Sequence, residues 1–401
     1  MFWEKKLAQW VEDVRATTNL PARLVLWDGQ QHDFGSFAAP QVTLKVNHAS
    51  ALPLLLEPSL DNLGEAYVKG KIDIEGKLSD IISIGYSLAK NTITGASKLA
   101  RVRRYFNHTK SSDKKAIQYH YDVSNAFYQL WLDENMVYSC AYFENGEEDL
   151  ATAQLKKIDH ILTKIQLQPG QRLLDIGCGW GALVLRAASK FGAKCVGVTL
   201  SQNQFDLATE RVKAAGLGDR IEIRLQDYRD IPGQFDRVTS VGMFEHVGRK
   251  NLPTYFSKVR ELLAEDGIAM NHGITSTDYD SGETALGGGE FIDRYVFPDG
   301  ELTGSGAIVT AMEDSGLEVQ HQENLRVHYA STLKAWCANL VEHWDECVAE
   351  AGLPIAKVWG LYMAGSRLAF ERNGIQLHQV LATRTATDGK SGYPLRHDFG
   401  V

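Results

Sequence analysis

The sequence predicts an α/β fold with a seven-stranded, mostly parallel sheet and helices on both faces. From residue 150 onward, helix-like and strand-like segments alternate, which is the pattern of a parallel sheet built from βαβ units. The clearest unit is the segment 173–181, LLDIGCGWG, where a buried strand runs into a glycine-rich turn and then a helix. A separate small module of helices and short strands precedes this part.

The predicted elements of the larger part follow the hydrophobic periodicity. Strands are expected at 173–176, 194–199, 220–225, 235–241, 267–273 and 318–327, and helices at 151–165, 182–190, 202–215, 252–264, 307–315 and 331–351. The stretch 275–305 is too long for an ordinary connection, so we expect it to be an insertion or a lid over a site.

Three regions are predicted along the chain. Residues 1–95 form a small α+β domain, with strand-like pieces at 23–27, 42–46 and 71–75 and helices at its start and at 60–69. Residues 96–118 form a basic linker, because the segment 98–115 holds seven Lys or Arg and one acid. Such a run is either a solvated linker or a contact with anionic lipid, and in a net-acidic protein we favour lipid. Residues 119–401 form the large domain.

Composition excludes several classes of protein. The 401 residues carry a net charge of −8, which argues against general nucleic-acid binding. The five cysteines form no CxxC pair, so neither a metal site nor a disulfide framework is indicated. No signal peptide and no apolar stretch of ~18 residues is visible, so we expect a cytoplasmic protein that at most lies on the inner face of the membrane.

The glycine loop predicts a ligand site at the carboxyl edge of the sheet. Gly177 and Gly179 let the backbone approach a ligand closely, but their spacing also fits a relaxed dinucleotide fingerprint. A nicotinamide site requires an acid about 20 residues on, and the second strand ends without one. The acids are instead Asp175, before the glycines, and Asp227, after the third strand, positions that suit the amino group and adenine of S-adenosylmethionine.

Nine short strings occur in one order along the chain. They are YHYDVSNAFY (119–128), MVYSCAYF (136–143), LLDIGCGWG (173–181), VTLSxxQ (198–204), QDYRD (226–230), MFEHVG (243–248), NHGI (271–274), YVFPDG (295–300) and HYxxTLxxW (328–336). In this order, from about residue 100 to 385, the chain resembles the cyclopropane-fatty-acyl-phospholipid synthases and, more distantly, the mycolic acid cyclopropane synthases. The resemblance implies the class I S-adenosylmethionine methyltransferase fold.

The resemblance also implies an activity and its residues. In that family the methyl group of S-adenosylmethionine is added to a cis double bond of a phospholipid acyl chain, and proton loss then closes a cyclopropane ring. The donor-binding residues implied by the motifs are Tyr138, Ser139, Asp175, Gly177, Gly179, Thr199, Leu200, Gln204, Asp227 and Tyr228. The family also implies a homodimer working on lipid at the membrane surface.

A second implied set holds a bicarbonate ion, the base proposed for the family. It comprises the side chains of Glu245, His272 and Tyr329 and the backbone of Cys140 and Ile274. Glu245 and His272 follow neighbouring predicted strands, so both are expected at the ligand-binding edge of the sheet. For His246 an active-site role and a purely structural role have similar weight. Ser366 occupies the position where some family members carry a cysteine, and the chemistry gives that cysteine no role.

Three alternatives remain open at this point. The first is a lipid methyltransferase that leaves a methyl or methylene branch without closing a ring. The second is a small-molecule methyltransferase, since plant alkaloid N-methyltransferases resemble the family too. The third is a lipid-binding protein that keeps the fold without catalysis, against which the intact set of Glu245, His272 and Tyr329 argues.

Overall fold

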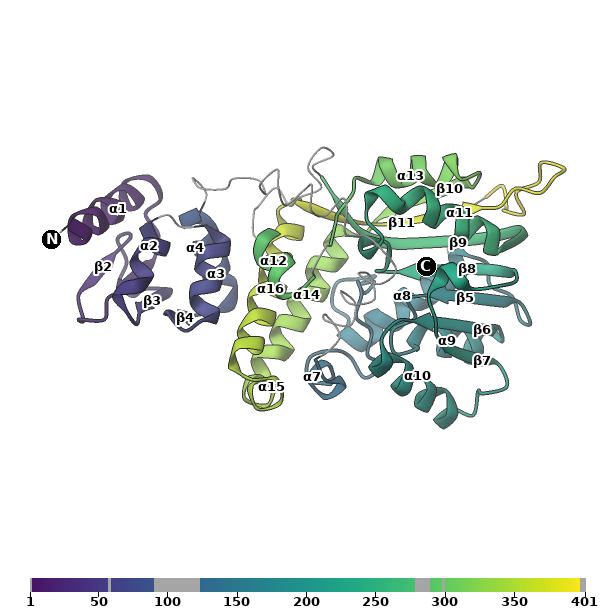
Figure 1. Ribbon diagram of the computed structural model, residues 1–401, viewed down its shortest axis with the longest axis horizontal. Coiled ribbons are helices and arrows are strands. Elements are labelled where there is room, and N and C mark those ends of the chain that lie inside the picture. The colour runs from purple at the N-terminus through teal and green to yellow at the C-terminus, as the bar shows by residue number, and fades with distance from the viewer. Residues whose placement is uncertain (1, 57–58, 90–122, 278–288, 298–299, 397–401) are drawn as a thin grey trace.

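Two sheets organise the chain in the computed structural model, which describes residues 2–56, 59–89, 123–277, 289–297 and 300–396. The larger sheet has seven strands in the order β10-β11-β9-β8-β5-β6-β7, and the smaller has four in the order β2-β1-β3-β4. Figure 1 shows the small sheet and its helices at one end of an elongated molecule and the large sheet at the other. The predicted basic linker lies outside the described residues.

The large sheet confirms the predicted fold class. Its strands are β5 (Arg172–Ile176), β6 (Lys194–Thr199), β7 (Ile221–Leu225), β8 (Phe235–Val241), β9 (Leu263–Ser276), β10 (Glu318–Asn324) and β11 (Ile375–Thr383). Strands β7, β6, β5, β8 and β9 pair in parallel, and β11 runs antiparallel to both β9 and β10. The strand order reverses at β5 and β8, which in open α/β sheets is where a ligand crevice forms.

Helices cover both faces of this sheet. On one face α8 (Leu150–Lys164) and α9 (Ala182–Phe191) bury apolar side chains against β5, β6 and β9. On the other face α11 (Leu252–Leu262) and α13 (Ser305–Asp314) pack against β5, β8 and β11. Helix α10 (Gln202–Ala214) begins after Ser201, whose hydroxyl accepts a hydrogen bond from the Gln204 N–H at 3.3 Å and so caps the helix.

A helical layer separates the two sheets. It contains α7 (Asn125–Gln129), α12 (Gly289–Tyr295), α14 (Arg326–Glu342), α15 (Trp344–Ala351) and α16 (Leu353–Glu371). The single helix predicted for 331–351 is wrong, because the chain leaves helical geometry at His343 and forms α14 and α15 instead. The strand predicted to reach 327 ends at Asn324, whose side chain accepts from the Arg326 N–H at 2.9 Å as α14 begins.

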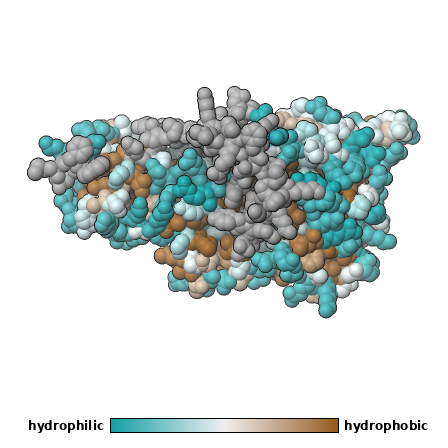
Figure 2. Space-filling view, in the orientation of Figure 1, coloured by the Kyte–Doolittle hydropathy of each residue, from teal (hydrophilic) through white to brown (hydrophobic). Residues whose placement is uncertain are grey.

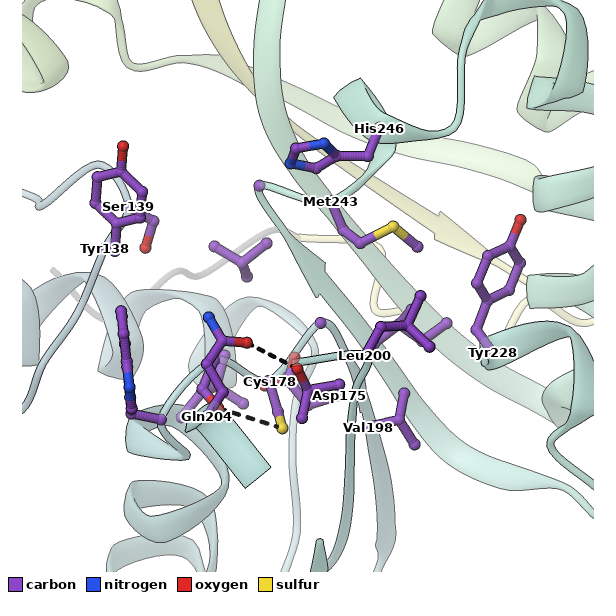
Figure 3. Close-up of a pocket in the computed structure, with 18 of the residues that line it drawn as sticks. Tyr138, Ser139, Asp175, Cys178, Val198, Leu200, Gln204, Tyr228, Met243 and His246 are labelled. Atoms are coloured by element: carbon purple, nitrogen blue, oxygen red, sulfur yellow. Dashed lines mark hydrogen bonds between the residues drawn. The ribbon is translucent and has the colours of Figure 1, made fainter. Parts of the chain in front are cut away.

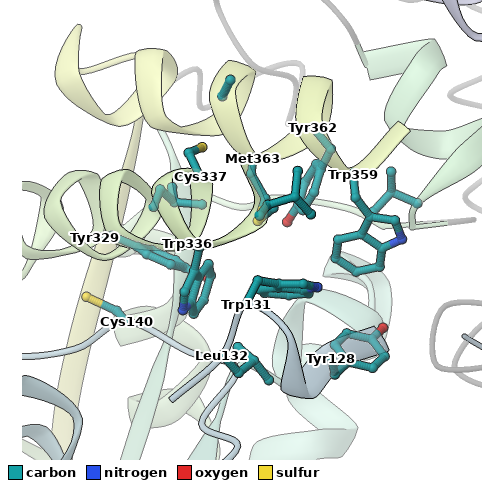
Figure 4. Close-up of a cluster of buried hydrophobic side chains, with 14 of the residues drawn as sticks. Tyr128, Trp131, Leu132, Cys140, Tyr329, Trp336, Cys337, Trp359, Tyr362 and Met363 are labelled. Atoms are coloured by element: carbon teal, nitrogen blue, oxygen red, sulfur yellow. The ribbon is translucent and has the colours of Figure 1, made fainter. Parts of the chain in front are cut away.

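Aromatic side chains fill the space beneath this layer. The Trp131 ring centroid lies 5.7 Å from that of Trp336 and 5.3 Å from that of Trp359. Tyr138 joins the same cluster at 5.5 Å from Trp131. Figure 4 shows Trp131, which follows α7, between Trp336 of α14 and Trp359 of α16, with Tyr329 and Cys140 at the edge of the group. The cluster therefore fixes α14 and α16 over the carboxyl edge of the sheet.

The N-terminal module comprises α1 (Phe2–Thr18), β1 (Ala22–Val25), β2 (Gln31–Asp33), β3 (Val42–Val46), η1 (Ala49–Ala51), α2 (Leu52–Leu56), α3 (Leu60–Val68), β4 (Ile72–Gly76) and α4 (Leu78–Ala89). Helix α1 packs inward through Leu7 and Val11, and the Trp10 ring lies 5.1 Å from Phe34. This placement agrees with a core role for the helix.

The module contacts the helical layer through specific polar bonds. Asp61, on α3, accepts a hydrogen bond from the Phe291 N–H of α12 at 2.6 Å, and Glu65 forms an ion pair with Arg294. The buried Lys357 of α16 donates to the Tyr67 carbonyl at 3.1 Å and lies 3.3 Å from Asp73. The bonds of Asp61 and Glu65 join the module to the insertion predicted at 275–305, and those of Lys357 join it to α16.

On the face shown in Figure 2, the described residues are largely hydrophilic, with apolar patches over the N-terminal module, over the lower end of the α15–α16 region and over the lower part of the large-sheet region. Among the described residues, no helix has both the length and the apolar character needed to cross a bilayer.

Candidate functional site

A first cavity of about 140 Å³ opens at the carboxyl ends of β5, β6 and β8, where the strand order reverses. It brings together all ten residues predicted to bind the donor: Tyr138, Ser139, Asp175, Gly177, Gly179, Thr199, Leu200, Gln204, Asp227 and Tyr228. Figure 3 shows Tyr138 and Ser139 on one wall, Tyr228 on the opposite wall, and Met243 with His246 above them.

The glycine loop forms the floor of this cavity. Gly177 and Gly179 have φ of 80° and 54°, in the left-handed region that side chains disfavour. The N–H groups of Gly177 and Cys178 both donate to the Val198 carbonyl at 2.9 Å, which ties the loop to β6. A Cβ on Gly177 would lie 3.0 Å from the Met243 side chain, so the missing side chain keeps the crevice between β5 and β8 open.

Asp175 sits below the loop as a buried acid. Its Oδ1 accepts a hydrogen bond from the Thr239 hydroxyl at 2.8 Å, and burial raises its pKa to about 6. Sequence reasoning missed its neighbour Lys157, which is 2 % exposed and lines the same cavity. Burial lowers the pKa of Lys157 to about 8, and its Nζ donates to the Ser139 hydroxyl at 2.6 Å. The helical periodicity of α8 signalled only that Lys157 lies on its inner face.

The other residues predicted to bind the methyl donor lie at or just after the ends of β6 and β7. The Thr199 hydroxyl donates to Gln204 Oε1 at 2.7 Å, and the same oxygen of Thr199 accepts from the Ser201 N–H at 3.1 Å. Asp227 holds Arg229 through two hydrogen bonds of 2.8 and 2.7 Å. A buried acid, a second acid at a strand end and apolar walls fit a ligand with an amino acid end and an adenosine end.

A second, larger cavity of about 260 Å³ adjoins the first and is mostly apolar. It contains all five residues of the second predicted set: Glu245, His272, Tyr329, Cys140 and Ile274. Among the residues that the structure describes, four line both cavities, namely Tyr138, Ser139, Gly242 and His246, so the two spaces meet there. The farther wall is supplied by the N-terminal module, through Leu44, Leu60, Leu63, Ile72, Ile74, Ile81 and Leu88 among others.

Glu245 is positioned by a backbone bond. Its Oε1 accepts from the Ile274 N–H at 2.7 Å, while its Oε2 is buried with no hydrogen-bond partner among the described residues. The Ile274 N–H, expected to face a bound anion, is thus used to hold Glu245. Burial raises the pKa of Glu245 to about 7, so both protonation states are accessible near neutral pH.

His272 and Tyr329 line the same cavity as Glu245. His272 is 1 % exposed, and its Nε2 has no hydrogen-bond partner among the described residues. Burial lowers the pKa of His272 well below its usual value, so the ring is neutral. Tyr329 is buried with its ring 4.6 Å from Phe370. His246 also lines both cavities, which places it at the junction.

The Cys140 thiol is not arranged as a nucleophile. It is fully buried, its Sγ donates to the Ala141 carbonyl at 3.2 Å, and burial raises its pKa above the ordinary range. Ser366 lines the second cavity, as the motif alignment allowed.

The fold and the first cavity define an S-adenosylmethionine-dependent methyltransferase. The chain belongs to the family described as mycolic acid cyclopropane synthetase, which matches residues 108–380. A domain of unknown function (DUF7884) matches residues 9–97.

Similar proteins support this assignment. A "probable fatty acid methyltransferase" of Pseudomonas putida is 46% identical over 94% of this chain and 95% of its own. The cyclopropane-fatty-acyl-phospholipid synthase of Escherichia coli (strain K12) is 38% identical over 67% of this chain and 68% of its own. The crystal structure of mycolic acid cyclopropane synthase CmaA1 with SAH and CTAB is 33% identical and has a TM-score of 0.64, covering 67% of this chain and 97% of its own.

We expect Gly273→Ala to disturb this site because no space exists for a side chain there. A Cβ on Gly273 would lie 2.0 Å from Phe244 Cε1 and 2.9 Å from Glu245 Oε1, so the turn after β8 must move. Overpacking of this kind costs about 1–3 kcal/mol, measurable by denaturant unfolding. The control is Gly306→Ala in α13, where the added Cβ meets nothing within 4 Å. Equal stability of the two variants would contradict the close approach.

Proposed function

We propose that this enzyme transfers a methylene unit from S-adenosylmethionine to a cis double bond in a phospholipid acyl chain, forming a cyclopropane ring. The observation that carries the proposal is the mostly apolar second cavity, which meets the donor cavity at Tyr138, Ser139, Gly242 and His246. An acyl chain in the second cavity would have its double bond beside the donor. The names of the relatives from E. coli and of CmaA1 support this substrate class.

The chemistry assigns separate tasks to the two cavities. When bound, S-adenosylmethionine supplies an electrophilic methyl group. The walls of the two cavities position the alkene, a weak nucleophile, and exclude water from it. Attack by the alkene leaves a cation on the acyl chain, and loss of a proton from the added methyl lets the C–C bond form that closes the ring. That proton requires a base close to the new methyl.

We propose that a bound bicarbonate is that base and that Glu245, His272 and Tyr329 hold it. The unpartnered Oε2 of Glu245 and Nε2 of His272 support a small polar guest in this otherwise apolar cavity. When bound, bicarbonate would supply negative charge near the cation and a site for the proton.

A second candidate is methylation without ring closure. The name of the P. putida relative, a probable fatty acid methyltransferase, favours it. Both routes share methyl transfer and the cation, and they differ in whether the chain is left with a ring or with a branch. We also propose that the protein works as a peripheral membrane enzyme and as a homodimer, on the resemblance alone.

Incubation with labelled S-adenosylmethionine and liposomes of unsaturated phospholipid distinguishes the candidates. Mass spectrometry and fatty-acid analysis should find label in a cyclopropane ring. Label in a methyl or methylene branch would replace the proposal with the second candidate. Absence of label from lipid, with the donor still bound, would reject both.

Glu245→Gln should reduce turnover at least ~100-fold, because it removes negative charge beside the developing cation. Donor binding, measured by calorimetry, should stay within a few-fold, since Glu245 lines the second cavity and not the first. Ser366→Ala is the comparison within the same cavity and should be far milder. Turnover of Glu245→Gln equal to the wild type would remove Glu245 from the mechanism.

Activity should depend on bicarbonate. The wild type should lose activity in buffer rigorously depleted of carbon dioxide and recover it on adding bicarbonate. Glu245→Asp should show the dependence at higher concentrations, because its shorter side chain draws back from the anion. A Glu245→Asp rate that ignores bicarbonate across a titration would show that the proton leaves by another route.

A further inference from the structure

A row of buried polar side chains runs across the sheet behind His272. In the register of β10, β11 and β9, Gln379 lies opposite both Glu323 and His272. Gln379 Nε2 lies 3.2 Å from His272 Nδ1, and Gln379 Oε1 accepts from Lys164 Nζ at 2.9 Å. Gln379 and Lys164 are both fully buried. None of this row except His272 lines either cavity.

The far end of the row is an ion pair. Lys164, on α8, forms an ion pair with Glu323. The Glu323 carboxylate also forms a hydrogen bond with His160 Nε2 at 2.9 Å. Burial alone would raise the pKa of Glu323, but the bonds from His160 and Lys164 hold that pKa at about 2. Glu323 is therefore ionised. Burial lowers the pKa of Lys164, and the charge and hydrogen bond of Glu323 oppose that shift, so Lys164 remains the hydrogen-bond donor between the two acceptors Glu323 and Gln379.

The chemistry of these groups sets a direction along the row. A lysine ammonium only donates hydrogen bonds, so the group of Gln379 that faces Lys164 must be its carbonyl oxygen. The amide NH₂ of Gln379 then faces His272, and Nδ1 of His272 must accept. A neutral imidazole that accepts at Nδ1 carries its proton on Nε2. That Nε2 is the buried atom without a partner among the described residues of the second cavity.

We propose that Gln379, oriented by Lys164 and Glu323, is a positioning residue that holds His272 as the Nε2–H tautomer, a hydrogen-bond donor into the second cavity. The tautomer itself does not depend on the proposed function. Only the role of the Nε2–H group, which is to donate a hydrogen bond to a bound anion, rests on that function. It has a consequence for the mechanism. An Nε2 that already carries a proton cannot accept the one lost from the methylated acyl chain, so His272 binds the base and is not the base.

The tautomer is directly observable without any assay of activity. In full-length protein labelled with ¹⁵N-histidine, long-range ¹H–¹⁵N correlation spectra distinguish the two neutral tautomers and the imidazolium, and His272→Asn assigns the signal. We expect His272 to be Nε2–H from roughly pH 6 to 8, around the usual histidine pKa. A signal of the Nδ1–H tautomer or of the imidazolium would overturn the proposal, whatever the enzyme does to lipids.

Gln379→Glu is the decisive variant because it reverses the direction of the row. A carboxylate at this position accepts from His272 Nδ1–H, so Nε2 keeps a proton only when the ring is cationic. The new carboxylate raises the pKa of His272, as Glu323 on β10 already does. Lys157, Lys164 and His160 on α8 act in the opposite direction and lower that pKa. Glu245 lines the same cavity and burial raises its pKa to about 7, so its protonation lowers kcat at low pH in the wild type and the variant alike. The charged His272 ring exists below its own raised pKa, so the ratio of variant to wild-type kcat should rise as pH falls. At pH above that pKa, kcat should be roughly 10- to 100-fold lower, with the KM for the donor little changed.

Two further variants separate positioning from folding. Gln379→Met is similar in size and leaves His272 without a partner at Nδ1, so kcat should fall without that rise of the ratio at low pH, and the NMR signal should show mixed tautomers. His378→Gln is the matched control on the same strand, where His378 bonds instead to Thr275 Oγ1 at 2.8 Å. A Gln379→Glu profile parallel to the wild type, or wild-type kcat in Gln379→Met, would overturn the proposal. Should either variant fold poorly, the wild-type tautomer still decides it.

Discussion

The hydrogen bond from the Ile274 N–H to the Glu245 carboxylate is the contact on which the site depends. It joins the turn after β8 to the end of β9, the two neighbouring strand ends at which the donor cavity and the apolar cavity meet. The bond is possible only because Gly273 has no side chain, which lets Phe244 and Glu245 pack directly on the strand. With Oε1 committed in this way, Oε2 faces the apolar cavity, and desolvation brings its acid–base equilibrium close to neutrality.

The sequence predicted the parts of this protein whose signals are local. β6 and β8 match their expected ranges because runs of buried residues end in turns, and the glycine loop is recognisable because its backbone needs positive φ at Gly177 and Gly179. Motif strings located both residue sets, and the structure gathers each set around one cavity. Strand β11, in contrast, was not placed, because its segment IQLHQVLAT (375–383) is buried along almost its whole length, polar residues included, and lacks the regular alternation of apolar and polar residues that identifies a strand.

Contacts between distant segments could not be predicted from the sequence. Lys157, Lys164 and Gln379 carry no motif, and their importance arises from burial and from cross-strand register that only the assembled sheet defines. The break at His343 has the same character. A helical pattern runs through 331–351, and nothing in it marks the break between α14 and α15. Helix periodicity reports which face is buried and not where a polar group on that face points.

The shared wall of the second cavity has a consequence for the integrity of the chain. Leu44, Leu63 and Ile72 belong to the core of the N-terminal module and also face the cavity next to helix α16, so one apolar surface serves two parts of the protein. If a protease cut the chain between the N-terminal module and the rest, and the two parts then separated, the apolar lining of the cavity would be exposed to water. Exposed apolar surfaces of that kind promote self-association. Each part of the chain therefore depends on the other to keep this apolar surface away from water.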